Sequence, residues 1–320
     1  MPICSICLTK EANQTGSHML SAFMIESTIG ERGNEKGYFI SDEPNFDYRN
    51  NTGAEPVVED YLFCSGCEQR MAYVEGYICR EYRDKIKTER FQQNFIDIIN
   101  AGQPDFIRQA NRVNSYAFTL FIATLLFRMS LSTKRLFHDF NLIPPEQEHL
   151  RVIINEALPT YENFKVKIKI PHFLKNLNEK GDLFNGLYFI IATYDHLDDK
   201  TMSFNLSHPT YRLPYNMMVS QVIILFFFEK PRDRTIYLDF FKILEERDIL
   251  LSLNGDGSPI RTIILEQSKW LSIISSIRDE IVANKMPGLM QVFVQEFVKK
   301  HLREPTSEDW RVYIEEKFPD

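Results

Sequence analysis

Apolar residues recur along this 320-residue chain at two different spacings. Across residues 68–160, and again across residues 239–317, they recur every three or four positions, which is the period of an amphipathic helix. Across residues 164–238 they alternate with polar residues or form short runs of β-branched and aromatic residues, which is typical of strands. The pattern therefore predicts an α+β fold, in which helices precede and follow an antiparallel sheet.

Helices are predicted at residues 68–86, 88–99, 106–131, 132–140, 144–157, 239–250, 265–283, 287–302 and 307–317. The helix at 106–131 is apolar nearly all round in its second half, so we expect it in the core. Arg128 interrupts that apolar run. Because a buried guanidinium must be paired, we expect acidic groups or helix C-terminal carbonyls around it.

Strands are predicted at residues 165–170, 186–194, 201–206, 219–228 and 236–238, and they would form a sheet of three to five strands. Nearer the N-terminus, residues 27–56 are rich in Gly, Asn, Asp and Glu, which indicates a long loop with one short strand at 37–41. A further strand is predicted at 57–63.

No apolar run reaches the roughly 18 residues of a membrane-spanning helix, so no membrane segment is expected. One alternative concerns the three consecutive Phe residues at 226–228. A helix there, in place of the predicted strand, would favour peripheral contact with a membrane.

Composition adds limits on the class of protein. A hydrophobic share of 44% supports a full core, and the chain is long enough for a small module and a larger domain. The net charge of −7 argues against a generally basic nucleic-acid coat, although it leaves room for a local basic groove. The start of the chain lacks the pattern of a signal peptide, and the cysteine usage indicates a reducing compartment, so we expect a cytoplasmic protein.

Four of the five cysteines form two Cys-x-x-Cys pairs, which are Cys4 with Cys7 and Cys64 with Cys67. A gap of two residues allows a tight turn that aims both sulfurs at one ion. Four thiolates in this arrangement predict a tetrahedral, structural zinc site. The fifth, Cys79, falls in a helical pattern and is interpreted as a small core residue. We expect a zinc-binding module at residues 1–87 and a larger domain at 88–320.

Between the cysteine pairs lies Ser17-His18, and the second pair is followed by Glu68 and then Glu75. This order resembles the HNH (ββα-metal) endonucleases, and within them a set of bacterial proteins associated with defence against phage. The resemblance covers residues 1–80 and extends loosely to residue 160. It implies that the N-terminal module is a treble clef, in which a zinc knuckle and a hairpin lead into a helix.

The resemblance also implies roles for three side chains. His18 would be the general base that takes a proton from the attacking water. Glu68 and Glu75, seven residues apart on one helix face, would hold Mg²⁺ or Mn²⁺ and so stabilise the leaving oxygen of a phosphodiester. Ser17 stands where the family usually has an Asp or His ligand.

Two functions remain open at this point. The first is an HNH-like, metal-dependent endonuclease, a hydrolase acting on nucleic acid in antiviral defence. The second is a non-catalytic, zinc-stabilised binding or adaptor protein, with a protein partner or a second copy of the chain. In the second case His18 would serve as a hydrogen-bonding residue that holds the zinc knuckle to the helix.

Overall fold

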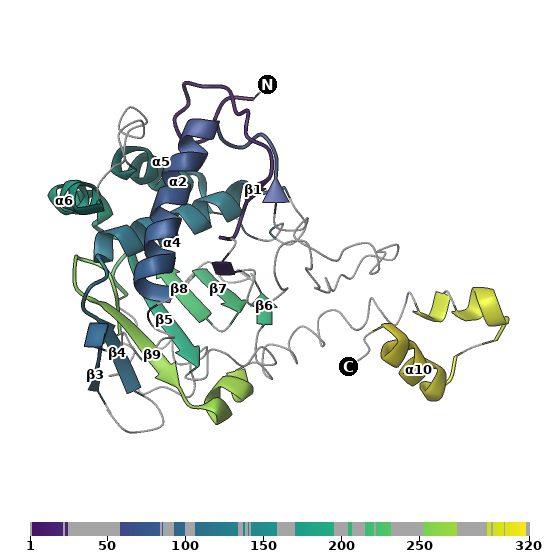
Figure 1. Cartoon of the computed structure of the whole chain (residues 1–320). Helices are drawn as coiled ribbons and strands as arrows, with labels where there is room; N and C mark the ends of the chain where they lie inside the picture. Colours follow the sequence, from purple (N-terminus) through teal and green to yellow (C-terminus); the bar gives the residue numbers. More distant parts are fainter. Residues whose placement is uncertain are drawn as a thin grey trace.

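The computed structural model describes residues 2–21, 23–24, 58–83, 85, 93–99, 106–133, 137, 140, 142–158, 170–194, 204–206, 215–220, 222–231, 252–273, 293–295, 297–303 and 305–317. The predictions for residues 27–56, 165–169 and 236–250 therefore lie outside the described residues, and so does most of the helix expected at 132–140. The predicted α+β class is confirmed: helices gather on one side of a sheet (Figure 1).

Among the described residues, the main sheet has seven strands in the order β3-β4-β9-β5-β8-β7-β6. Their bounds are Phe95–Ile99 (β3), Phe106–Ala110 (β4), Tyr188–Tyr194 (β5), Phe204–Leu206 (β6), Tyr215–Ser220 (β7), Val222–Phe227 (β8) and Ile260–Leu265 (β9). Neighbouring strands are antiparallel except β5 and β9, which run parallel. The sheet is thus larger than the pattern predicts.

Side chains along the central strands alternate between two apolar layers. On β5, Phe189 and Ile191 belong to the layer shared with the helices, whereas Ile190 and Ala192 belong to the layer on the opposite face. Trp270, in the helical segment that follows β9, is fully buried in that second layer. Burial on both faces explains why these strands are nearly continuous apolar runs.

In the part of the chain that the structure describes, four helices and two short helical turns cover the first layer. They are α2 (Ser65–Ile78), α4 (Ser115–Leu131), α5 (Pro144–Ala157), α6 (Ile170–Glu179), a π-helical turn at Cys79–Arg83 and a 3₁₀ turn at Gly181–Phe184. The central helix is α4, which is buried nearly all round and contacts α2, α5 and α6. It begins where the side chain of Asn114 accepts a hydrogen bond from Ala117 N at 2.9 Å, an N-cap.

Two helix predictions are wrong at the edge of the sheet. Residues 95–99, expected at the end of a helix at 88–99, form β3, and residues 106–110, expected at the start of a helix at 106–131, form β4. Pairing of these strands with each other, and of β4 with β9, outweighs the local helical spacing.

The burial of β3 has the period of a strand. Ile96 and Ile98 are exposed, whereas Phe95 packs against the core. Asp97 lies directly opposite Arg108, and Arg108 Nε donates to Asp97 Oδ1 at 2.8 Å. This cross-strand ion pair fixes the register of the edge strand.

Some of the other predicted strands are confirmed, and the structure also has elements that the pattern does not predict. The strand predicted at 186–194 is confirmed as β5, and the described part of the strand predicted at 201–206 is β6. The single strand predicted at 219–228 is divided instead, because residues 219–220 end β7 and residues 222–227 form β8, which pairs antiparallel with β7. The pattern does not predict β9, which ends where a helix was expected to begin at residue 265. It also does not predict α6, because residue 170 was expected to end a strand.

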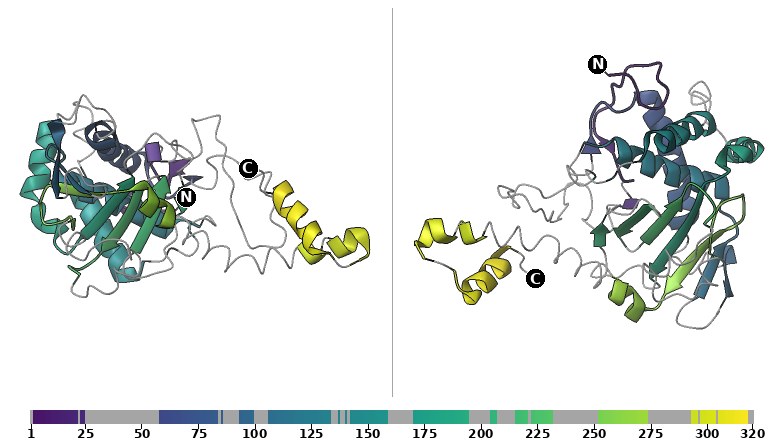
Figure 2. Two further views of the ribbon diagram at one scale, coloured as in Figure 1. Left: turned by 90° about the horizontal axis from the view of Figure 1, so that it is seen from below. Right: turned by 180° about the vertical axis from the view of Figure 1, so that it is seen from behind.

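Near the C-terminus, α10 (Ser307–Lys317) confirms the helix predicted at 307–317. The ring of Phe293 packs on Tyr313, with 4.8 Å between centroids. Figures 1 and 2 show this segment at the opposite end of the molecule from α6.

Within the described ranges, no helix has both the length and the apolarity needed to cross a bilayer. The domain boundary predicted at residue 87 lies among residues that the structure does not describe, and it stays a prediction. Buried side chains from both sides of this boundary belong to the same apolar layer.

Candidate metal centre and the ion cluster beside it

Cys4 and Cys7 lie in a tight turn closed by backbone hydrogen bonds. Leu8 N donates to Cys4 O at 3.0 Å, and Cys4 N donates to Lys10 O at 2.8 Å. Leu8 has a φ of 54°, a left-handed conformation that reverses the chain sharply. The turn therefore presents both sulfurs on one side, as the spacing predicts.

The second pair lies where α2 begins. Cys64 is the residue just before the helix, and Cys67 is in its first turn. The helix start is capped from the knuckle, because Asn13 Oδ1 accepts a hydrogen bond from Ser65 N at 3.0 Å. This bond brings the two cysteine pairs together across the long intervening segment.

A short hairpin lies between the knuckle and the helix. It consists of β1 (Ser17–His18) and β2 (Val58–Glu59), which pair antiparallel. Knuckle, hairpin and helix follow one another in the order of a treble clef. The predicted class of the N-terminal module is thus confirmed.

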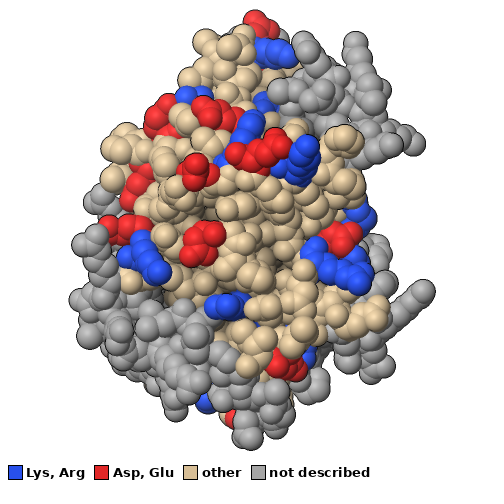
Figure 3. Space-filling model, turned by 90° about the vertical axis from the view of Figure 1, so that its left-hand side faces the viewer, with Lys and Arg blue, Asp and Glu red and all other residues tan. Residues whose placement is uncertain are grey.

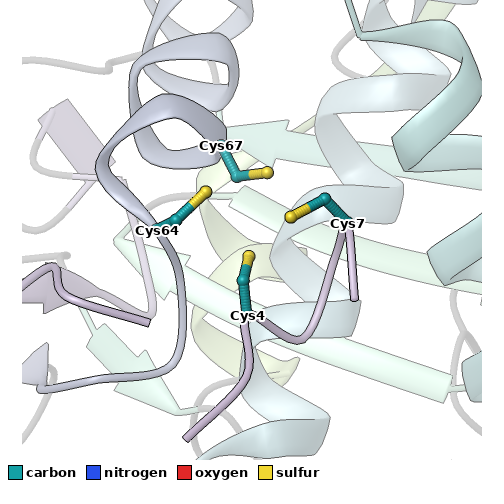
Figure 4. A group of neighbouring side chains, drawn as sticks. All are labelled: Cys4, Cys7, Cys64 and Cys67. Carbon is teal, nitrogen blue, oxygen red and sulfur yellow. The ribbon is translucent and has the colours of Figure 1, made fainter. Parts of the chain in front are cut away.

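The four sulfurs converge on one point (Figure 4). The Sγ atoms of Cys4, Cys7, Cys64 and Cys67 all lie within 4.8 Å of one another, and the four cysteines are not in disulfides. A tetrahedral zinc ion with Zn–S bonds of about 2.3 Å would hold its sulfurs about 3.8 Å apart, so these residues fit the ion. Among the described residues, no other group of three or more His, Cys, Asp and Glu lies close enough to share an ion.

The cysteine thiols shift one another's pKa values. A hydrogen bond with Cys67 lowers the pKa of Cys4 to about 4, and the same bond, together with burial, raises the pKa of Cys67. Burial also raises the pKa of Cys64. Zinc binds thiolates, so its binding would release the remaining protons.

Two arginines attach the metal module to α5. Arg70 of α2 is buried, and its Nη2 donates to Asn155 O at 2.7 Å and to Leu158 O at 3.0 Å, at the C-terminal end of α5. Arg151 Nη1 donates to Ile6 O, inside the knuckle, at 2.9 Å. The sulfur site is therefore anchored to the helical layer.

A second polar cluster lies along α2, beginning at the residue that follows Cys67. Arg128, in the last turn of α4, is only 1% exposed, forms an ion pair with Glu75 and has its Nη2 3.7 Å from Glu68 Oε1. The two carboxylates are two helical turns apart and share a face. The expectation that Arg128 has acidic partners is confirmed. The sequence carries no local signal that Arg128 belongs to the predicted site.

Ser17 is the hairpin residue beside this cluster. Burial raises the pKa of Glu68, the charge of Arg128 lowers it, and the Ser17 hydroxyl is close enough to lower it further. Three buried atoms, Ser17 Oγ, Glu68 Oε2 and Arg128 Nε, have no hydrogen-bond partner within the described part of the chain. Buried polar atoms without partners mark a place for water or an ion.

His18 is half-buried and lies opposite Val58 in the hairpin. Neighbouring residues of a strand point to opposite faces, so Ser17 and His18 diverge. The side chain that β1 places near Glu68 is that of Ser17. The roles predicted for His18, Glu68 and Glu75 in catalysis stay predictions.

The two acidic residues at the end of the hairpin make other contacts. The Glu59 carboxylate accepts hydrogen bonds from Ser132 Oγ at 2.5 Å and from Thr133 N at 3.0 Å, just after α4. Asp60 Oδ1 accepts a hydrogen bond from Gly16 N at 2.6 Å. Both carboxylates therefore stabilise the module.

Figure 3 shows the charge on one face of the molecule. Lys and Arg are interspersed there with Asp and Glu around a broad uncharged area, and the described residues on this face form no continuous basic surface. Phosphate backbones are usually bound by clustered Lys and Arg. This face therefore lacks the charge distribution of a nucleic-acid interface.

No protein-family model, curated protein or solved structure matches this chain. The class defined by the fold and the site is thus an α+β protein with a treble clef and a four-cysteine site suited to structural zinc.

Proposed function

We propose that the chain is a metal-dependent nuclease of the HNH type, which hydrolyses phosphodiester bonds in the bacterial cytoplasm in defence against phage. The observation that supports this proposal is the order of elements: β1 carries His18, β2 pairs with it, and α2 carries Glu68 in its first turn. The HNH endonucleases that the sequence resembles place a His on the corresponding strand and close with a Cys-x-x-Cys that leads into a helix.

Each side chain has a role suited to its chemistry. His18 accepts a proton from the attacking water, because an imidazole titrates near neutral pH. Glu68 and Glu75 are the carboxylates that would hold Mg²⁺ or Mn²⁺, which would stabilise the leaving oxygen. The fit of a cation is supported by Glu68 Oε2, which is buried without a partner in the described residues. The four-cysteine site is structural, since all four positions are taken by sulfur.

A second candidate function is non-catalytic. In this case the treble clef is a zinc-stabilised binding or adaptor module, and its partner is a protein or a second copy of the chain. The observation that favours it is Arg128, whose guanidinium already lies against the carboxylates that would hold the metal. The ion cluster would then serve to join α2 to α4.

Cleavage of plasmid DNA and of RNA by the zinc-loaded chain distinguishes the two candidates. We expect nicking that requires Mg²⁺ or Mn²⁺, and we expect His18→Ala to abolish it while zinc content stays at one ion per chain. His149→Ala is the matched control, because His149 is an exposed residue of α5, and it should retain full activity.

Two results would contradict the nuclease proposal. Full activity in His18→Ala would remove the imidazole from the mechanism. An absence of cleavage in the wild type, with either metal and on either nucleic acid, would favour the adaptor.

A further inference from the structure

The cluster of Glu68, Arg128 and Glu75 is held between two helices and shielded from water. The two carboxylates come from α2 and the guanidinium from α4. The side chains of Glu68 and Glu75 are 20% and 18% exposed, and that of Arg128 is 1% exposed. In such a place an unpaired charge is strongly destabilising, so each charge needs a counter-ion close by.

The charges of the cluster do not balance. Two carboxylates and one guanidinium leave one negative charge uncompensated. Arg128 directs Nη1 to Glu75 and Nη2 to Glu68 Oε1. On the far side of the Glu68 carboxylate, Oε2 has no hydrogen-bond partner within the described residues, and neither has the fully buried Ser17 Oγ beside it. These oxygens are of the kind that a hard divalent cation binds.

We propose that Arg128 is a built-in counter-ion that competes with a divalent cation for Glu68 and Glu75. A guanidinium and a metal ion bind the same carboxylate oxygens. The positive charges of the guanidinium and the metal ion would also repel each other if both lay at these carboxylates. Because Arg128 is tethered to α4, it is always present at the carboxylates, and a free ion must displace it. The wild-type cluster therefore binds a divalent cation only weakly, because the ion competes with the guanidinium for the same oxygens.

This inference deepens the proposed function, since it concerns the same carboxylates, but it is measured by ion binding alone. Replacing Arg128 with an uncharged residue leaves two half-buried carboxylates that repel each other. A divalent cation would relieve that repulsion and stabilise the folded state by mass action. Removal of the guanidinium should thus convert a weakly binding cluster into a metal site.

The experiment is a Mn²⁺ titration of the zinc-loaded full chain, followed by electron paramagnetic resonance of free Mn²⁺ and by thermal unfolding. We expect weak binding by the wild type and binding at least roughly tenfold tighter by Arg128→Met. Arg128→Lys keeps the charge and should resemble the wild type. Arg128→Met combined with Glu68→Gln should lose the gain.

Arg108→Met is the matched control. It also removes an arginine from an ion pair, in this case with Asp97 on β3, and should leave Mn²⁺ affinity unchanged. If Arg128→Met does not fold alone, its refolding is titrated with Mn²⁺. A yield that rises with Mn²⁺ supports the inference, and a yield indifferent to Mn²⁺ overturns it.

Equal Mn²⁺ affinity in the wild type and Arg128→Met would overturn the inference, and so would tight binding by the wild type that Arg128→Met loses. The proposed function can fail separately. Mn²⁺ binding that follows the expected order without any cleavage would support the inference and contradict the nuclease. Cleavage that requires metal, together with the same Mn²⁺ affinity in the wild type and Arg128→Met, would support the nuclease and contradict the inference.

Discussion

Two charged clusters on α2 neutralise their charge in different ways. At the start of the helix, sulfurs from two separate turns converge, and thiolates there need an ion from outside the chain. Further along the helix, Glu68 and Glu75 meet a cation that the chain itself supplies, Arg128. Soft thiolates bind zinc strongly, whereas carboxylates pair readily with a guanidinium, so ligand chemistry accounts for the difference.

The two clusters should stabilise the fold in different ways. We expect folding of the knuckle to depend on a metal ion, whereas the contact between α2 and α4 should depend on a balance of side-chain charges. The first cluster is therefore broken by removing a ligand or the ion, and the second by removing one member of the ion pair.

The largest effect is expected at the sulfur site. Cys67→Ser removes one of its three buried ligands and should abolish zinc binding, with a loss of roughly 5 kcal/mol or more, because zinc affinity is folding free energy in such modules. Zinc per chain and thermal unfolding measure this. Cys79→Ser is the control and should retain one zinc. Wild-type zinc content in Cys67→Ser would contradict the four-sulfur site.

The next largest effect is expected at the ion cluster. Arg128→Met should cost about 3–5 kcal/mol, because it leaves carboxylates in a shielded place without their counter-ion. Glu75→Gln should cost less, since Arg128 keeps Glu68. The variant that combines Arg128→Met with Glu75→Gln should lose less stability than the two single losses added together. We expect this difference, the coupling free energy, to be about 1–3 kcal/mol in urea unfolding. Strict additivity would show that the pair contributes nothing.

The same two clusters show how far sequence alone reaches. The four cysteines that could hold zinc are predictable because the two-residue gap inside each pair is a local signal. The two pairs are predicted to come together because a tetrahedral zinc ion needs four ligands. The Glu68 and Glu75 pair is likewise local, being two turns of one helix. Arg128 belongs to a different helix, and the pattern shows only that it needs acidic partners, not which ones.

The errors in the sheet have a related cause. Residues 95–99 are mostly apolar, with spacings compatible with either a helix face or a strand. The decisive pairing joins β4 to β9, whose residues lie far along the chain. A β-strand is stabilised by its neighbours in the sheet, so local spacing cannot identify it until the partner is known. The central strands β5 and β8 are predictable because they are apolar on both faces.

A pair of substitutions at the sheet edge tests this interpretation, with an effect smaller than those at the charged clusters. Ile107→Ala, at a fully buried position of β4, should cost about 2–4 kcal/mol. Ile98→Ala, at an exposed position of β3, should change stability by less than about 0.5 kcal/mol in the same urea titration. A helix at residues 88–99 would instead bury Ile98 together with Phe95, so a large cost at Ile98 would favour the helix.

The smallest effect is expected at α10, where Asp309 forms an ion pair with Arg303, whose side chain is 52% exposed. Thr306 and Asp309 form a capping box: Thr306 N donates to Asp309 Oδ2 at 2.8 Å, and Asp309 N donates to Thr306 Oγ1 at 3.3 Å. Thr306→Ala should cost about 1 kcal/mol of local helix stability. Amide hydrogen exchange across α10 measures this, and the melting of the main sheet should not change.

Acid should weaken the same cap. Hydrogen bonds from Arg303 and Thr306 lower the pKa of Asp309 below its ordinary value. A carboxylate whose folded pKa is lowered stabilises the fold at pH values above its unfolded pKa of about 3.9, and this contribution is lost as the pH falls through the lower folded value. Protection factors in α10, which are corrected for the intrinsic pH dependence of amide exchange, should therefore fall at low pH in the wild type, and much less in Asp309→Asn, which cannot titrate. An equal response in both would show that the Arg303–Asp309 pair, whose arginine is far more exposed than Arg128, does not stabilise the helix.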